Sequence, residues 1–279
     1  MIGAAIKSFG DMNAAVPLSR VDAKRENNAR SYEGTRISII VPAWDEAPLI
    51  RSFLEHVRER APDTEIIVAD GGSSDGTTEL AKKFADRLVR TRRNRAVQMN
   101  AGARVASGDV LWFLHVDVEL PAQCLDEIGR TLNDPNVVGG YFRIRLPRSP
   151  FVYRLTDSFA HYAGILLRMR CGDHGIFCRR RLFEDLGGFP ETPIMEDVEF
   201  FRMLQQRGRV AYIDKRIVVS PRRYERVGVL RLTLAYGLIA ALYAAGAPLR
   251  VLIWLYARTC GYVKNADATG NFIVPIRNK

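Results

Sequence analysis

Short β-branched and apolar runs alternate with helix-forming stretches through the first half of the 279-residue chain. Strands are predicted at residues 37–41, 65–69, 88–89 and 110–114, and helices at 48–60, 77–84 and 95–106. Such alternation is typical of right-handed βαβ units. It therefore predicts an α/β, Rossmann-like fold with a mixed, mostly parallel sheet that carries helices on both faces. A helix is further predicted at 196–206, and strands at 209–213 and 217–220.

Composition divides the chain into three parts. Residues 1–36 show no apolar period and are expected to form a mobile N-terminal tail, residues 37–226 form the globular domain, and residues 227–279 form a C-terminal helical segment. This last part holds 17 consecutive uncharged residues from 232 to 248, whereas a membrane-spanning helix needs about 20. Two interpretations stay open. The segment is either a hairpin at an anionic membrane surface, with Arg231, Arg250 and Arg258 at the headgroups, or part of the core or a dimer interface.

Basic residues exceed acidic ones by ten, and 34 of the 41 basic residues are arginine. Because arginine binds phosphate and carboxylate through a planar fork, this excess favours an anionic ligand, although a bias of the coding DNA produces the same excess. The four cysteines show no metal-binding spacing, and the N-terminus shows no secretory pattern. We therefore expect reduced thiols in a cytoplasmic protein.

Polar residues follow three of the predicted parallel strands, at the edge where open α/β sheets bind ligands. They are Pro42-Ala43-Trp44-Asp45-Glu46, then Asp70-Gly71-Gly72-Ser73-Ser74-Asp75-Gly76-Thr77, and His115-Val116-Asp117. Acids gathered there repel one another unless a metal or a cationic group lies among them. Taken singly, the second loop is equally a turn with a helix cap, and His115 is more often a histidine packed at a strand end.

The chain has neither a G-x-G-x-x-G fingerprint nor a P-loop, which argues against dinucleotide-binding and P-loop enzymes. A nucleotidyltransferase that uses the acidic α/β crevice with a metal stays open. A basic nucleic-acid-binding protein fits the net charge, but its usual motifs are missing and an acidic crevice repels a phosphate backbone. We therefore expect no nucleic-acid partner.

The polar motifs, together with Glu196-Asp197, resemble in order and spacing those of family 2 glycosyltransferases of the GT-A fold. The His-x-Asp variant, with Gln98-Met99-Asn100 before it and the 171–177 motif after it, is most similar to a bacterial subgroup known as arsenosugar-biosynthesis-associated glycosyltransferases. The resemblance covers residues 37–224, and it implies that the globular domain is a GT-A domain.

The resemblance also implies a role for each matching residue. The residues expected to bind the nucleotide sugar are Pro42, Ala43, Trp44, Glu46, Asp70, Gly72, Arg95, Arg222 and Arg223. Those expected to hold a divalent cation, Mg²⁺ or Mn²⁺, are Asp117 and His115, and those on the acceptor side are Asp173 and Glu196. Asp197 matches the general base of inverting members. Two positions depart from the family pattern: Gly71 replaces the second acid of an Asp-Asp pair, and His115 replaces the first acid of Asp-x-Asp.

The implied reaction moves a sugar, with inversion, from a nucleotide-diphosphate sugar to an acceptor hydroxyl that Asp197 deprotonates. The acceptor is unknown, and a lipid-linked one would fit peripheral contact with the inner face of the cell membrane. We further expect the region 137–180, which has no clear period, to act as a lid that excludes water.

Overall fold

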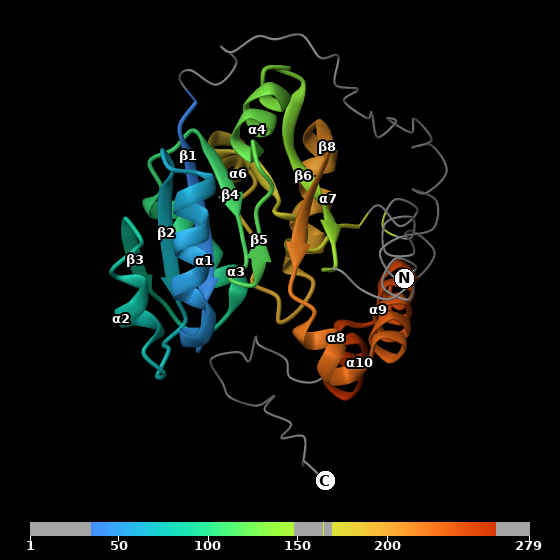
Figure 1. Ribbon diagram of the computed structural model, residues 1–279. Helices are drawn as coiled ribbons and strands as arrows, with labels where there is room; N and C mark the ends of the chain where they lie inside the picture. Colours follow the sequence, from blue (N-terminus) through green and yellow to red (C-terminus); the bar gives the residue numbers. More distant parts are fainter. Residues whose placement is uncertain (1–34, 148–163, 165–168, 261–279) are drawn as a thin grey trace.

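The computed structural model describes residues 35–147, 164 and 169–260 (Figure 1). Its first half follows the predicted alternation, with β1 (Ile37–Ala43), α1 (Ala47–Arg60), β2 (Glu65–Asp70), α2 (Thr77–Ala81), β3 (Arg87–Arg90), α3 (Arg95–Val105) and β4 (Val110–Phe113). The predicted α/β fold is confirmed. The predicted N-terminal tail lies almost wholly outside the described residues.

The second half of the domain completes an eight-stranded sheet in the order β3-β2-β1-β4-β7-β6-β8-β5. Its elements are β5 (Val118–Glu119), α4 (Cys124–Leu132), β6 (Val137–Arg145), a 3-10 turn η2 (Gly172–His174), β7 (Phe177–Arg179), α6 (Arg180–Asp185), α7 (Glu196–Arg207) and β8 (Arg209–Val219). Strands β3, β2, β1 and β4 run parallel, as do β6 and β8, whereas β7 runs antiparallel to β4 and β6. The carboxyl ends of β1, β2 and β4 therefore meet at one edge.

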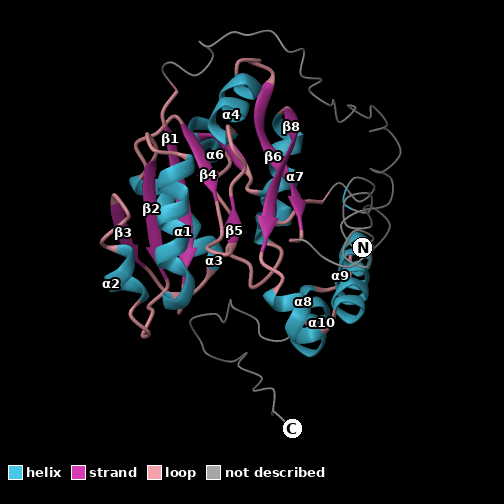
Figure 2. Ribbon diagram, in the orientation of Figure 1, coloured by secondary structure: helices cyan, strands magenta, loops and turns pink. Residues whose placement is uncertain are grey.

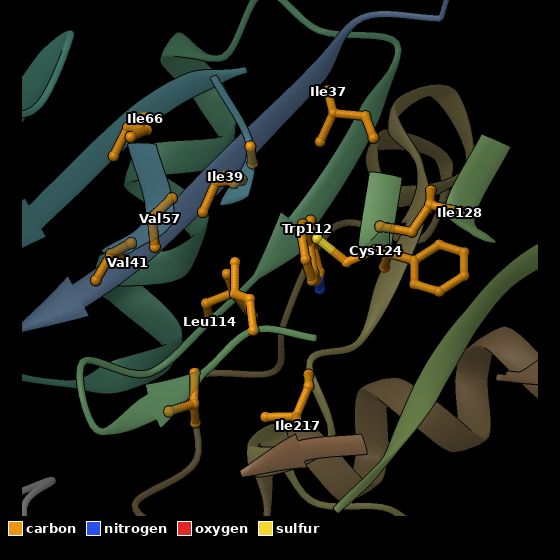
Figure 3. Close-up of a cluster of buried hydrophobic side chains, with 14 of the residues drawn as sticks. Ile37, Ile39, Val41, Val57, Ile66, Trp112, Leu114, Cys124, Ile128 and Ile217 are labelled. Atoms are coloured by element: carbon orange, nitrogen blue, oxygen red, sulfur yellow. The ribbon is translucent and has the colours of Figure 1, made fainter. Parts of the chain in front are cut away.

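Helices cover both faces of this sheet (Figure 2). Alternate residues of a strand point to opposite faces, so Ile39 and Trp112 pack under α1 and α4, as Figure 3 shows for this cluster. Ile40 and Phe113 point the other way and pack against α3, α6 and α7. Strands buried on both faces read as continuous apolar runs, which is why β1 and β4 are visible in the sequence.

Two sequence predictions need correction. The region 137–180, which was expected to act as a lid, contains the strands β6 and β7. Residues 148–163 and 165–168 of that region lie outside the described residues. This strand pair is not evident in the sequence, because Gly139 in β6 weakens the strand pattern. The glycine allows β6 and β7 to approach closely, since a Cβ there would lie 2.4 Å from the Phe177 carbonyl oxygen. The two strands predicted at 209–213 and 217–220 are one strand, β8. Asp214 and Lys215 bulge out of its pairing with β6 and interrupt the apolar pattern.

The predicted C-terminal helical segment is present as α8 (Arg222–Val227), α9 (Val229–Ala244) and α10 (Leu249–Thr259), beyond the carboxyl end of β8 (Figure 1). We call α9 and α10 the C-terminal hairpin. Its buried face includes Leu232, Ile239 and Leu252, which pack with Ile194 just before α7. Its outer face leaves large apolar side chains exposed, namely Leu230, Leu234, Leu238, Val251 and Trp254. None of the helices in the described ranges is both long enough and apolar enough to cross a membrane.

Candidate active site

Gln98, on α3, holds the carboxyl ends of β1 and β2 together. Its Nε2 donates to the carbonyl oxygens of Ala43, at 2.7 Å, and Ala69, at 2.9 Å. A Cβ at Gly71 would lie 3.1 Å from the Gln98 amide, so the acid that the family pattern has at position 71 would crowd this side chain. Gly71, the first departure from the family pattern, therefore leaves room for the Gln98 side chain. The sequence motif contained Gln98, but nothing in it indicated this role.

Asp70 orders the loop after β2 rather than facing outward. Its carboxylate is fully buried and accepts hydrogen bonds from the Gly72 N–H at 3.1 Å, from the Ser73 N–H at 3.2 Å and from the Ser73 hydroxyl at 2.5 Å. Gly72 has φ +85°, a left-handed conformation that glycine adopts without strain. Arg90 Nε lies 3.6 Å from the carboxylate. Contact between Asp70 and a nucleobase stays a prediction, and it requires a change in this loop.

The segment after β1 exposes one large side chain. Pro42, Ala43 and Glu46 are buried, whereas Trp44 is partly exposed and stacks under Arg93, whose guanidinium carbon lies 3.5 Å from the ring centroid. Such a cation–π pair fixes a flat surface beside the Asp70 loop. Pro42 and Ala43 can therefore shape a nucleoside pocket from beneath, and Trp44 is the side chain available for direct contact.

Arg222, at the start of α8, lies between two acidic strand ends. Its Nη2 is 3.4 Å from Asp117 Oδ2 and 3.9 Å from Glu46 Oε2, and its side chain is half exposed. This arginine supplies part of the positive charge that the gathered acids require. The sequence predicted a metal or a cationic group among these acids, and the resemblance assigned Arg222 to the diphosphate. Neither indicated that Arg222 contacts both Asp117 and Glu46.

The predicted metal ligands offer one carboxylate and one imidazole. Asp117 is partly exposed, and burial lowers the pKa of His115, which keeps its ring neutral and able to act as a ligand. Within the part of the chain that the structure describes, no cluster of three or more His, Cys, Asp or Glu could hold a metal by itself. Asp117 fits an Mg²⁺- or Mn²⁺-type ion that takes its remaining ligands from phosphate oxygens and water, whereas the His115 imidazole is a softer ligand whose Nε2 faces Gly172 and Asp173.

Asp197 is held by the turn η2. Its Oδ2 accepts a 2.6 Å hydrogen bond from the Gly172 N–H, and its Oδ1 lies 2.8 Å from the Val198 nitrogen. Any larger residue at position 172 would displace the imidazole or the turn, because a Cβ there would lie 2.4 Å from His115 Nε2. Gly172 thus leaves room for His115, the second departure from the family pattern. The imidazole, the turn and the Asp197 carboxylate pack together.

Glu196 differs sharply from its neighbour Asp197. It is fully buried, and Arg95 Nε lies 2.6 Å from its Oε1. Burial raises the pKa of Glu196, while the Arg95 guanidinium opposes that rise. Arg95 was predicted to bind the nucleotide, but its guanidinium is engaged here on the acceptor side. Glu199, the third acid of this helical turn, accepts a hydrogen bond from the Tyr243 hydroxyl of α9.

Asp173 and Arg223 lie on the side of the site that faces the C-terminal hairpin. Asp173 is half exposed, with its Oδ1 3.9 Å from His115 Nε2. Arg223 contacts different partners from Arg222: its Nη1 donates to the hydroxyls of Tyr236 at 2.7 Å and Tyr256 at 3.2 Å. The sequence did not single out either tyrosine, because no local pattern reports a contact between α8 and the hairpin.

The chain matches the model of glycosyl transferase family 2 over residues 38–187, more than half its length, and belongs to that family. Glycosyltransferase AglE of Haloferax volcanii is 29% identical over 169 residues, covering 55% of this chain and 56% of AglE. The chain thus spans little more than half the length of this curated relative.

Solved structures share the fold. The mannosyltransferase PcManGT from Pyrobaculum calidifontis, solved with GDP-Man and Mn²⁺, has a TM-score of 0.56 at 23% identity, covering 81% of this chain and 69% of that one. Glucosyl-3-phosphoglycerate synthase from Mycobacterium tuberculosis, solved with Mn²⁺, UDP-Glc and phosphoglyceric acid, has a TM-score of 0.58 at 19% identity, with coverages of 83% and 89%.

Proposed function

We propose that this protein transfers a sugar from a nucleotide-diphosphate sugar to an acceptor hydroxyl, with inversion. The observation that carries this proposal is the arrangement of Asp197, Gly172 and His115. The Gly172 N–H donates to the Asp197 carboxylate, and the same glycine packs against His115, two residues before Asp117. Family membership supports the reaction class, and two proteins of the same fold bind GDP-Man or UDP-Glc together with Mn²⁺. The subgroup motifs, now linked to packing around Gln98 and Gly172, support membership in the arsenosugar-biosynthesis-associated subgroup.

On the donor side, Trp44 and the loop ordered by Asp70 and Gly72 would bind the nucleoside above Pro42 and Ala43, at the carboxyl end of β1. Arg222 would bind the diphosphate from its position between Asp117 and Glu46. Asp117 and His115 would hold a divalent cation, which when bound offsets the charge that grows on the departing diphosphate. We propose that Arg223 adds a further cation from the opposite side.

On the acceptor side, Asp197 would accept the proton of the attacking hydroxyl. Its orientation is set by the Gly172 N–H, and Asp173 at the same turn is exposed enough to contact an acceptor. Glu196 would position Arg95 rather than act on the acceptor, because its carboxylate already faces that guanidinium. General-base catalysis of this kind contributes about 10²- to 10⁴-fold to rate.

We propose a membrane-associated acceptor, in keeping with a cytoplasmic protein that binds the inner face of the cell membrane. The C-terminal hairpin exposes Leu234 and Trp254, and no acidic residue occurs from 226 to 260. Exposed arginines surround the apolar face, namely Arg226, Arg231, Arg250 and Arg258. An apolar face with a basic rim fits an anionic lipid surface.

Vesicle co-sedimentation tests this membrane surface. The protein should pellet with phosphatidylglycerol vesicles at low salt and much less with phosphatidylcholine, and Leu234→Glu with Trp254→Glu should abolish the binding. Exposed Leu230 lies on the same face, so Leu230→Glu alone should weaken it. A protein that stays in the supernatant with both lipids at low salt would remove the membrane proposal and leave the hairpin as an interface.

A thermal-shift panel of nucleotide sugars, with and without Mn²⁺, tests the donor proposal. A ligand that binds only the native state raises the melting temperature by mass action, so one nucleotide sugar should stabilise the protein and Mn²⁺ should enlarge the shift. Asp117→Ala should lose the Mn²⁺-dependent part while the fold persists. No stabilisation by any member of the panel would reject the proposal. Release of pyrophosphate instead of a nucleoside diphosphate would indicate a nucleotidyltransferase.

A further inference from the structure

Arg223 is held by two tyrosines that belong to the C-terminal hairpin, outside the residues that the family model matches. Both hydroxyls bind the same nitrogen, Nη1. The rings of Tyr236 and Tyr256 lie 6.5 Å apart at 34°, one from each helix of the hairpin. The two contacts orient the guanidinium and leave its Nη2 and Nε hydrogens without a partner among the described residues.

Arg223 is partly buried, and within the described ranges no carboxylate lies within ion-pair distance of its guanidinium, unlike those of Arg222 and Arg95. Burial raises the pKa of the Tyr236 hydroxyl far above its ordinary range, so the tyrosine is neutral and cannot offset this charge. A guanidinium withdrawn from water without a counter-charge is costly, and an anion that binds beside it removes that cost.

Arg223 lies between the two ends of the site. The neighbouring Arg222 contacts Asp117, and the Ser220 N–H donates to the Asp117 carbonyl oxygen at 2.9 Å, which ties the start of α8 to the candidate metal ligand. Burial works against the charge of Arg223, while Tyr256, Tyr236 and, more weakly, the Asp173 carboxylate on the other side raise its pKa. An anion bound here would therefore lie next to both the departing group and the acceptor.

We propose that Arg223, Tyr236 and Tyr256 form an anion subsite that binds a phosphate group at the reaction centre. Arg223 is the phosphate ligand, and the two tyrosines are its positioning residues. The inference rests on the proposed function, in which the phosphate belongs to the donor diphosphate or to a phosphorylated acceptor. The C-terminal hairpin is then a part of the active site, so a protein cut after α7 or β8 would lack a complete site.

The test compares the Tyr236→Phe/Tyr256→Phe double variant and Arg223→Gln with the wild-type protein. Tyr243→Phe is the matched control, because it removes a hydroxyl from the same hairpin that contacts Glu199 instead of Arg223. Calorimetry measures the affinity for inorganic pyrophosphate and for the nucleoside diphosphate that binds best in a panel. Hydrogen bonds to charged groups are strong enough for a loss of about tenfold or more in both test variants, with less than about twofold in the control.

Separate arms identify the source of the phosphate. A weaker pyrophosphate affinity and a raised donor KM assign the subsite to the donor diphosphate. An unchanged pyrophosphate affinity with a raised KM for a phosphorylated acceptor, but not for the donor, assigns it to the acceptor. Test variants that match Tyr243→Phe in every binding constant and KM would overturn the subsite. If the hydroxyl double variant does not fold, Tyr256→Phe alone is measured against the same control.

The failure of the proposed function looks different. In that case the wild-type protein itself binds no nucleoside diphosphate and turns over no nucleotide sugar. Pyrophosphate binding that depends on the tyrosines would still support the anion subsite.

Discussion

Adding a single methyl group at position 172 should displace the packing of Gly172, His115 and Asp197. In Gly172→Ala the new Cβ would lie 2.4 Å from His115 Nε2, whereas ordinary contacts begin at 3.4 Å, so about 1 Å must open between them. Either the imidazole swings away or the turn η2 moves. Because the Gly172 N–H binds Asp197 Oδ2 at 2.6 Å, movement of the turn shifts the hydrogen bond that orients the base.

A misplacement of about 1 Å in a catalytic constellation can lower turnover by about 10²-fold, and we expect a loss of that order. The crowding should cost about 1–3 kcal/mol of stability, offset in part by about 0.4–1 kcal/mol because alanine restricts the unfolded chain more than glycine does. The assay measures release of nucleoside diphosphate at saturating donor, beside the melting temperature and donor affinity of the same preparation.

His115→Ala provides the control, because it removes the atom that the new methyl group meets. The double variant Gly172→Ala/His115→Ala should be no slower than His115→Ala alone, which is the non-additivity expected of two groups in direct contact. Wild-type turnover in Gly172→Ala, or losses that simply add in the double variant, would refute the packing argument.

Three further outcomes are expected. Gln98→Leu should destabilise the protein by about 1–3 kcal/mol and weaken donor binding, because the carbonyl oxygens of Ala43 and Ala69 both lose the amide donor, although Ala43 keeps its bond from the Gly71 N–H. An unchanged donor titration and melting curve would contradict this. Asn100→Ala removes two hydrogen bonds to the backbone of Phe189, at 2.8 Å each, so it should lower kcat more than donor affinity, and equal effects on both would argue for general unfolding. Glu65 is desolvated, but hydrogen bonds from Ser107 and Ser38 and the charge of Arg87 lower its pKa below 4.5. The wild-type protein should therefore lose stability as the pH falls below 4.5, and Glu65→Gln should show a flatter acid unfolding curve.

Much of the sheet could be predicted because its central strands are buried on both faces. β1 and β4 appear as apolar runs, and the loops that follow them carry the polar residues expected at such an edge. The strand pair β6 and β7 could not be predicted, since Gly139 serves a close approach to Phe177 that only the folded chain reveals. β8 was divided because Asp214 and Lys215 bulge from the ladder.

The sequence indicated candidate site residues but not how they pair with one another. The family resemblance assigned both Asp117 and Arg222 to the donor, and the structure brings Arg222 Nη2 to 3.4 Å from Asp117 Oδ2. The sequence could not show that Arg95 pairs with Glu196, because that ion pair joins segments about 100 residues apart. The contacts of the C-terminal hairpin were hidden for the same reason, and Tyr256 had no local signal.

The central claim is that Asp197 acts as the base, and three amide variants test it most directly. Helix-dipole stabilisation alone would give the acids of the first turn of α7 similar, modest roles, worth about 0.3–1 kcal/mol each. Turnover of Asp197→Asn, Glu196→Gln and Glu199→Gln is measured at saturating donor, with donor affinity as the control for folding. The account predicts that Asp197→Asn alone lowers turnover by about 10²- to 10⁴-fold at unchanged donor affinity, while Glu199→Gln changes little. A near-wild-type rate in Asp197→Asn, or the large loss in Glu196→Gln instead, would contradict it.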